Sequence, residues 1–208
     1  MKLMNSIATF ALSVACSLAS AAPAIVSFNG GSLFPAFSTD DTVGFVFRAN
    51  ANLSVTQLGW FSTDGSIGAS HQIGIWTSAG SLLGSATVTP GAPDGTGFRY
   101  VGVAPIMLDS GEQYFIGGHD TIGDGDNYVT SVQNLVTDTD ITYIGSAAVG
   151  NVGFAFPSSV NTVTTGGRFG ANFIFDVVAV STVPEPGSLA LLGLGLAGLA
   201  AIRKRKQA

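Results

Sequence analysis

Cysteine is almost absent from this 208-residue sequence, and its one cysteine, Cys16, lies in an apolar N-terminal stretch. The rest of the chain therefore has no thiol, which excludes disulfides, zinc–thiolate sites and cysteine nucleophiles there. A body of roughly 160 residues is nevertheless large enough to be stable through its hydrophobic core alone.

Charge is also scarce, at 10% of the residues, and positive charge is scarcest in the body. Three arginines stand against twelve acids between Asp40 and Asp176, which gives that region a net charge of −9. Nucleic acid is excluded as a partner by this balance, because phosphate binding needs a basic face. Lysine and glutamate, which usually cover helices, are nearly missing, and the remaining composition favours a β-rich secreted domain.

Helical periodicity is missing between the two termini, where no ten consecutive residues show apolar side chains at helical spacing. Residues 42–48 instead alternate, with Val43, Phe45 and Phe47 on one face, which is typical of a half-buried strand. About nine to eleven short strands separated by turns predict an all-β fold, an antiparallel β-sandwich with jelly-roll-like connections. Further strands are predicted at residues 53–60, 71–76, 82–89, 98–103, 113–117 and 169–180.

The predicted strand at 53–60 changes phase along its length. Leu53 and Val55 share one face, whereas Leu58 and Trp60 share the other. This change predicts a β-bulge or a fully buried strand end.

The N-terminal residues 1–21 have the three parts of a secretory signal peptide. Lys2 supplies the positive charge, residues 7–18 supply the short apolar helix, and the small residues 19–21 supply the cleavage site. Cleavage after Ala21 is expected, with Ala24 as the alternative. The sequence thus predicts an N-terminal signal helix, export through the inner membrane, and a body domain at 22–182.

The C-terminal residues 183–208 combine a proline motif, an uncharged apolar run at 187–202 and a basic end. As a helix the run would span about 24 Å, which is short of the ~30 Å hydrocarbon core of a bilayer. We expect one C-terminal transmembrane helix at 187–202 whose basic end at 203–206 stays in the cytoplasm.

These parts, in this order, resemble the PEP-CTERM sorting signal. The resemblance implies recognition by an exosortase, a membrane enzyme thought to cut near the motif, and transient anchoring in the membrane. It implies a location at the cell surface or in an extracellular matrix rich in exopolysaccharide, as in a biofilm. The recognition residues would be Pro184, Glu185 and Pro186, and the cytoplasmic stop would be Arg203, Lys204, Arg205 and Lys206.

The body is similar to an uncharacterised β-sandwich module of exported proteins. The resemblance covers residues 58–60, 71–76, 80–88 and 108–114. Because that module has no established activity, it implies the fold and no chemistry. The expected function is that of a structural or adhesive protein, and the alternative is a carbohydrate-binding module, with or without the assistance of calcium.

One segment of the body has the residue types of a metal site. Asp120, Asp124, Asp126 and Asn127 offer hard oxygen ligands on a glycine-rich loop, and such ligands suit calcium. The segment departs from the EF-hand pattern, because the twelfth position counted from Asp124 is Leu135 rather than a glutamate. The alternative is an ordinary solvated turn. No other cofactor is expected.

No catalytic set is recognisable, so we expect a protein that is not an enzyme. The two histidines, His71 and His119, have no nucleophile motif near them, and we expect them to be structural or surface residues. Residues 109–111 have the Asp-Ser-Gly order of an aspartic protease motif, but the triplet occurs once and is typical of a turn.

Two tryptophans are candidates for a sugar-stacking surface. Trp60 and Trp76, together with neighbouring tyrosines, could lie against the faces of a carbohydrate. Their alternation with Leu58, Ile73 and Ile75 favours a place in the core instead.

Overall fold

The computed structural model describes residues 21–162 and 167–179. Within these ranges the chain forms fourteen β-strands and no helix, and every strand pair in its sheets is antiparallel. The predicted all-β, antiparallel fold is therefore confirmed.

The larger sheet has six strands in the order β13-β12-β4-β9-β6-β7. Its strands are β4 (Asp40–Ala49), β6 (His71–Thr77), β7 (Leu82–Val88), β9 (Gln113–Thr121), β12 (Ile141–Gly150) and β13 (Ser159–Asn161).

A second sheet of four strands has the order β1-β14-β5-β8. Two short ribbons, β10-β3 and β11-β2, complete the described part of the chain. The chain passes repeatedly between the two large sheets, for example from β4 to β5 and back to β6, as in β-sandwich folds. The bounds are β1 (Ala22–Pro23), β2 (Ile25–Asn29), β3 (Ser32–Phe34), β5 (Leu53–Phe61), β8 (Phe98–Leu108), β10 (Tyr128–Thr130), β11 (Gln133–Thr137) and β14 (Ala171–Val177).

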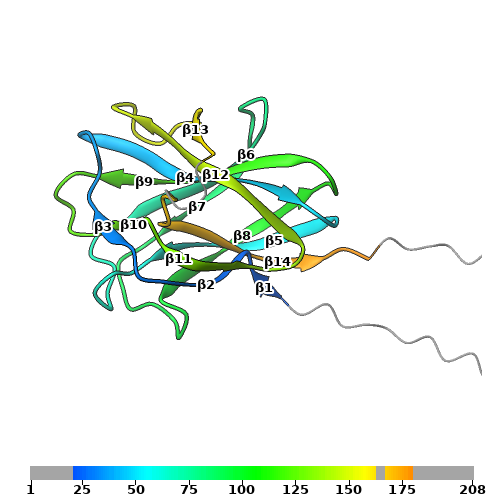
Figure 1. Ribbon diagram of the computed structural model, residues 1–208, viewed down its shortest axis with the longest axis horizontal. Coiled ribbons are helices and arrows are strands. Elements are labelled where there is room, and N and C mark those ends of the chain that lie inside the picture. Colours follow the sequence, from blue (N-terminus) through cyan, green and yellow to red (C-terminus); the bar gives the residue numbers. More distant parts are fainter. Residues whose placement is uncertain (1–20, 163–166, 180–208) are drawn as a thin grey trace, which may run out of the picture. The chain divides into compact units, whose positions relative to one another are not determined.

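The two large sheets share one hydrophobic core (Figure 1), in which β4 and β12 lie over β5 and β14. The predicted alternation of β4 places Phe45 and Phe47 in this core, and β14 supplies Phe173 from the opposite side. The rings of Phe47 and Phe173 lie 4.9 Å apart between centroids. Because no thiol is available in the body, apolar contact of this kind must hold the sheets together.

The phase change predicted in strand β5 is present as a bulge. Gln57 pairs with Ile174 of β14 and Val55 pairs with the next residue, Phe175, so Thr56 is the extra residue of the bulge. The bulge lets Leu53, Val55, Leu58 and Trp60 all be buried.

Several boundaries differ from the sequence prediction. The prediction ended β9 at residue 117 and assigned residues 120–127 to a loop, but β9 runs on to Thr121 and includes Asp120. Strands β2, β3 and β11 were missed because they are short and largely exposed, which leaves little alternation to recognise.

Two predicted segments, the signal peptide and the C-terminal tail, concern the ends of the chain. The signal peptide at 1–21, apart from its last residue, and the tail at 183–208 lie outside the described residues. The chain divides into Met1–Val178 and Ala179–Ala208. None of the described residues belongs to a helix with the length and hydrophobicity that membrane crossing requires.

Removing the ring of Phe173 should destabilise the fold strongly. Because Phe173 is fully buried between the sheets, Phe173→Ala should lower the free energy of unfolding by about 3–5 kcal/mol, measured by urea denaturation. Phe37→Ala removes a ring that is 47% exposed and contacts Arg168, so it should cost no more than about 1 kcal/mol. Equal losses would contradict this account of the core.

Candidate functional site

Buried polar side chains gather at one end of the six-stranded sheet, where β4 and β6 begin and β9 ends. His71 is the first residue of β6, and Asp41 of β4 lies opposite Asp120 of β9 in the strand register. His71 and Asp41 are fully buried and Asp120 is 1% exposed. Two carboxylates that face each other inside a sheet are unfavourable unless other groups compensate their charge.

The indole of Trp60, from the other sheet, covers His71. Its ring lies parallel to the imidazole of His71 at 4.3 Å between centroids. The close fit depends on Gly118 and Gly170, since a Cβ at either position would come within 2.4 Å of the indole carbons. The stacking therefore closes off the face of the His71 ring that points toward the core.

His71 is held through both ring nitrogens. Nδ1 lies 2.8 Å from the backbone carbonyl oxygen of His119, and Nε2 lies 3.0 Å from Oδ2 of Asp126. The carboxylate of Asp126 also accepts hydrogen bonds from the backbone amides of Gly68 and Ala69. Burial alone would raise the pKa of Asp126, but the hydrogen bonds from Gly68, His71 and Ala69 outweigh it and lower the pKa.

The carboxyl groups of Asp41 and Asp120 differ in their hydrogen bonds. Asp41 accepts hydrogen bonds from the backbone amide and the hydroxyl of Ser38. Neither carboxylate oxygen of Asp120 has a hydrogen-bond partner among the described residues. Burial, reinforced by the negative charges of Asp124 and Asp41, raises the pKa of Asp120 to about 8.

Asp124 completes the cluster from the loop after β9. Its oxygens accept hydrogen bonds from the backbone amides of Thr121 and Asp126, which fold the loop back on itself. One donor atom each from His71, Asp120 and Asp124 lies within 4.8 Å of the others. This group of described residues could hold a metal ion.

The structure thus brings together only part of the metal set expected from sequence. Asp120 and Asp124 belong to the converging group, and Asp126 contacts it through His71. Asn127 is partly buried beside Asp126 in the chain. The sequence-based set consisted of oxygen donors from one loop, whereas the structure adds a nitrogen donor from a distant strand.

His71 was expected to be structural and was not included in the metal set. A signal for its inward orientation was present in the sequence, because His71 has the same phase as Ile73 and Ile75 in an alternating strand. The other histidine, His119, is 26% exposed and pairs with Asp40, whose pKa is lowered chiefly by this hydrogen bond.

The Asp-Ser-Gly triplet at 109–111 forms the turn between β8 and β9. The backbone amide of Asp109 donates to the hydroxyl of Tyr114 at 2.8 Å, and Gly111 has the positive φ of 86° that suits a glycine.

Both tryptophans proposed for sugar stacking are buried. Trp60 has no exposed surface and Trp76 is 3% exposed. Trp76 packs on the outer face of the six-stranded sheet beneath Phe154 and Phe156. The expectation that they belong to cores fits this arrangement, and neither ring offers a face to a ligand.

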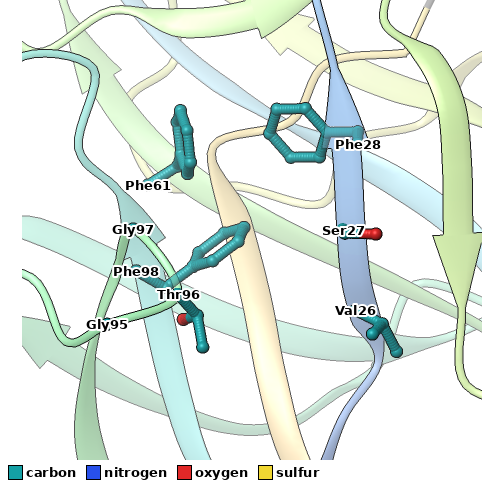
Figure 2. Close-up of a pocket in the computed structure, with 8 residues that line it drawn as sticks. All are labelled: Val26, Ser27, Phe28, Phe61, Gly95, Thr96, Gly97 and Phe98. Atoms are coloured by element: carbon teal, nitrogen blue, oxygen red, sulfur yellow. The ribbon is translucent and has the colours of Figure 1, made fainter.

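A different aromatic surface lines a pocket of about 530 Å³ beside β2 (Figure 2). The ring of Phe61 lies 5.1 Å between centroids from the ring of Phe28 and the same distance from the ring of Phe98. Figure 2 shows the three rings turned toward a common space, with Ser27 and Thr96 adding hydroxyl groups. Sequence reasoning missed this pocket because its residues come from three separate segments.

Comparison with known families assigns the body and the tail. Residues 35–166, more than half of the chain, match the domain of unknown function DUF4082. The chain belongs to the DUF4082 family. The match includes β4 to β13 and hence His71, Asp120 and Asp124 of the polar cluster. Among curated proteins the search found no match.

The tail of this DUF4082 protein matches the PEP-CTERM protein-sorting motif over residues 182–206. The match includes the Pro184–Pro186 triplet and the basic residues 203–206. The resemblance noted in the sequence is thereby confirmed. The motif indicates an exported protein that an exosortase sorts at the membrane.

Asp126 should be important for the stability of the DUF4082 domain even without metal. Asp126→Ala leaves His71 and the amides of Gly68 and Ala69 without their acceptor, so we expect a loss of about 3–5 kcal/mol in unfolding free energy, measured with a chelator present. Asp64→Ala removes an exposed carboxylate with one hydrogen bond to Ser66 and should cost no more than about 1 kcal/mol. A similar small loss for Asp126→Ala would show that the network is dispensable.

Proposed function

We propose that this protein is a structural or adhesive module of the cell surface or extracellular matrix, delivered by its C-terminal motif. The observation that carries the proposal is the PEP-CTERM match at residues 182–206, behind a β-rich body. In this proposal an exosortase at the membrane processes the chain, and the body then associates with extracellular polysaccharide.

The character of the body supports a passive role outside the cell. Its net charge of −9 between Asp40 and Asp176 disfavours nucleic acid and anionic membrane surfaces. Its stability rests on a core shared by two sheets and needs no disulfide.

We further propose that the protein is not an enzyme. Among the described residues, the ring nitrogens of His71 contact a carbonyl and a carboxylate, and the ring is fully buried under Trp60. His119 pairs with Asp40. A general base needs a nucleophile within hydrogen-bond reach and access to the substrate, and neither histidine has both.

The fate of the C-terminus tests the proposal directly. In wild-type cells, mass spectrometry of the mature protein should find a C-terminus near Pro184–Pro186, and the body should partition with extracellular polymer. Replacing Pro184, Glu185 and Pro186 by alanine should leave the tail intact to Ala208 and the protein bound to membranes, because the extended proline segment that an enzyme can grip is gone.

Two comparisons make this test specific. Deleting the exosortase should reproduce the alanine variant, whereas Ser181→Ala, just before the matched residues, should be processed normally. A tail that ends at Ala208 in wild-type cells would show that the motif is not cleaved and that the tail serves only as a membrane anchor.

A carbohydrate-binding role is the second candidate, and the pocket of Phe28, Phe61 and Phe98 favours it. An apolar, aromatic lining with a few hydroxyl groups is typical of small-ligand sites. The pocket lining includes no carboxylate, so binding here should not need calcium.

Phe61→Ala should weaken binding of extracellular polysaccharide fragments at least about tenfold, equivalent to ~1.4 kcal/mol, because Phe61 packs against both other rings of the pocket. Glycan-array binding followed by titration calorimetry would measure this. Phe37→Ala, which removes an exposed ring elsewhere, is the matched control. Unchanged binding in Phe61→Ala would exclude this pocket as the sugar site.

A further inference from the structure

Asp120 is a buried carboxyl group without a hydrogen-bond partner in the described part of the chain. It is 1% exposed, and both of its oxygens lack hydrogen bonds. Asn172 is equally buried, yet it bonds to Ile25, Tyr100 and Phe173 through its amide oxygen and nitrogen. Since buried polar groups are nearly always satisfied, a buried carboxyl group without a partner among the described residues points to a bound proton, water or ion.

The surroundings of Asp120 call for positive charge. Asp41 lies opposite it in the sheet, and Asp124 and Asp126 follow in the next loop. The only ion pairs formed by the described residues are His71–Asp126 and His119–Asp40, so no arginine is paired with Asp120 there. A concentration of carboxylates with so little cationic compensation is unfavourable inside a protein unless protons or a metal cation bind there.

The hydrogen bonds of His71 fix which ring nitrogen a cation could take. The carbonyl of His119 can only accept, so Nδ1 carries the proton in the neutral ring. Without a metal, a second proton on Nε2 donates to the Asp126 oxygen 3.0 Å away, and a metal ion that displaces this proton would take the Nε2 lone pair. Two lone pairs facing each other repel unless a proton or a metal ion lies at that position, and an Nδ1–H bond to a backbone carbonyl is usual for a metal-bound histidine.

We propose that His71, Asp120 and Asp124 bind a divalent transition-metal ion, for which zinc is the best fit, with the carboxylate of Asp126 adjacent to His71. The three donor atoms already lie within 4.8 Å of one another. Tetrahedral zinc with bonds of about 2.1 Å places its donors about 3.4 Å apart. Binding would therefore draw the loop of Asp124 toward β6 and β9.

The types of ligand atom in this site favour zinc over calcium. Calcium takes six to eight oxygen ligands, whereas an imidazole nitrogen combined with carboxylates suits zinc and its neighbours. Trp60 closes off the face of the His71 ring that points toward the core. We infer a structural site that fastens the loop after β9 to the start of β6, and this inference does not depend on the proposed surface role.

The test uses the full chain, purified in detergent and stripped of metal with a chelator. Zinc at a hundredfold excess over its dissociation constant should raise the thermal midpoint by about 5–10 °C, while calcium should not. Asp120→Asn should abolish the rise in response to zinc. Its metal-free midpoint should equal or exceed that of the wild type, because the substitution keeps the shape of the side chain and removes a buried carboxyl group that has no partner, so loss of folding cannot explain the result.

His119→Gln is the matched control, because it changes the other histidine and leaves the three donors in place. It should keep the zinc response, whereas His71→Gln should lose it, and elemental analysis should find about one zinc per chain only where the response is present. The proposal is overturned if the wild type does not respond to zinc or if Asp120→Asn responds normally. A response to calcium alone would overturn the role of His71 and restore an all-oxygen site.

Discussion

Contact between the inner faces of two antiparallel sheets is the interaction on which this structure depends. The body has no disulfide, so burial of apolar surface is its main source of stability. Phenylalanines on β4 and β14 meet across the interface, and the bulge in β5 turns both halves of that strand toward the core. The segments that carry the polar cluster and the pocket are positioned by this packing.

The polar cluster is an exception inside an otherwise apolar arrangement. His71 occupies an inward position of β6 that an isoleucine would fill more simply, and Trp60 covers it. Asp120 faces another carboxylate and has no partner among the described residues. Such a local conflict with the rules of core packing is typical of functional or ligand-binding positions. The zinc proposal accounts for the orphaned carboxylate and the bonded imidazole together.

Two distinct kinds of information are combined in this chain. The tail is a linear signal, since Pro184–Pro186, the apolar run and the basic end act through their order along the sequence. The body belongs to the DUF4082 family, and its chemistry depends on side chains brought together from separate strands. The sorting signal can therefore be recognised from the sequence alone, whereas the residues that could bind a ligand in the body are brought together only by folding.

The sequence by itself determined the fold class and the sorting motif. Alternation in segments such as 42–48, the phase change at 53–60 and the absence of helical periodicity are local properties, and local patterns specify strands. Short exposed strands such as β3 left too few residues for a pattern. Only the tertiary structure decided that His71 meets Asp120 and Asp124, that Trp60 and Trp76 are buried, and that three phenylalanines from distant segments line one pocket. The reason is that sheet register and packing between sheets join residues far apart in the chain, and these contacts have no signature at any fixed spacing.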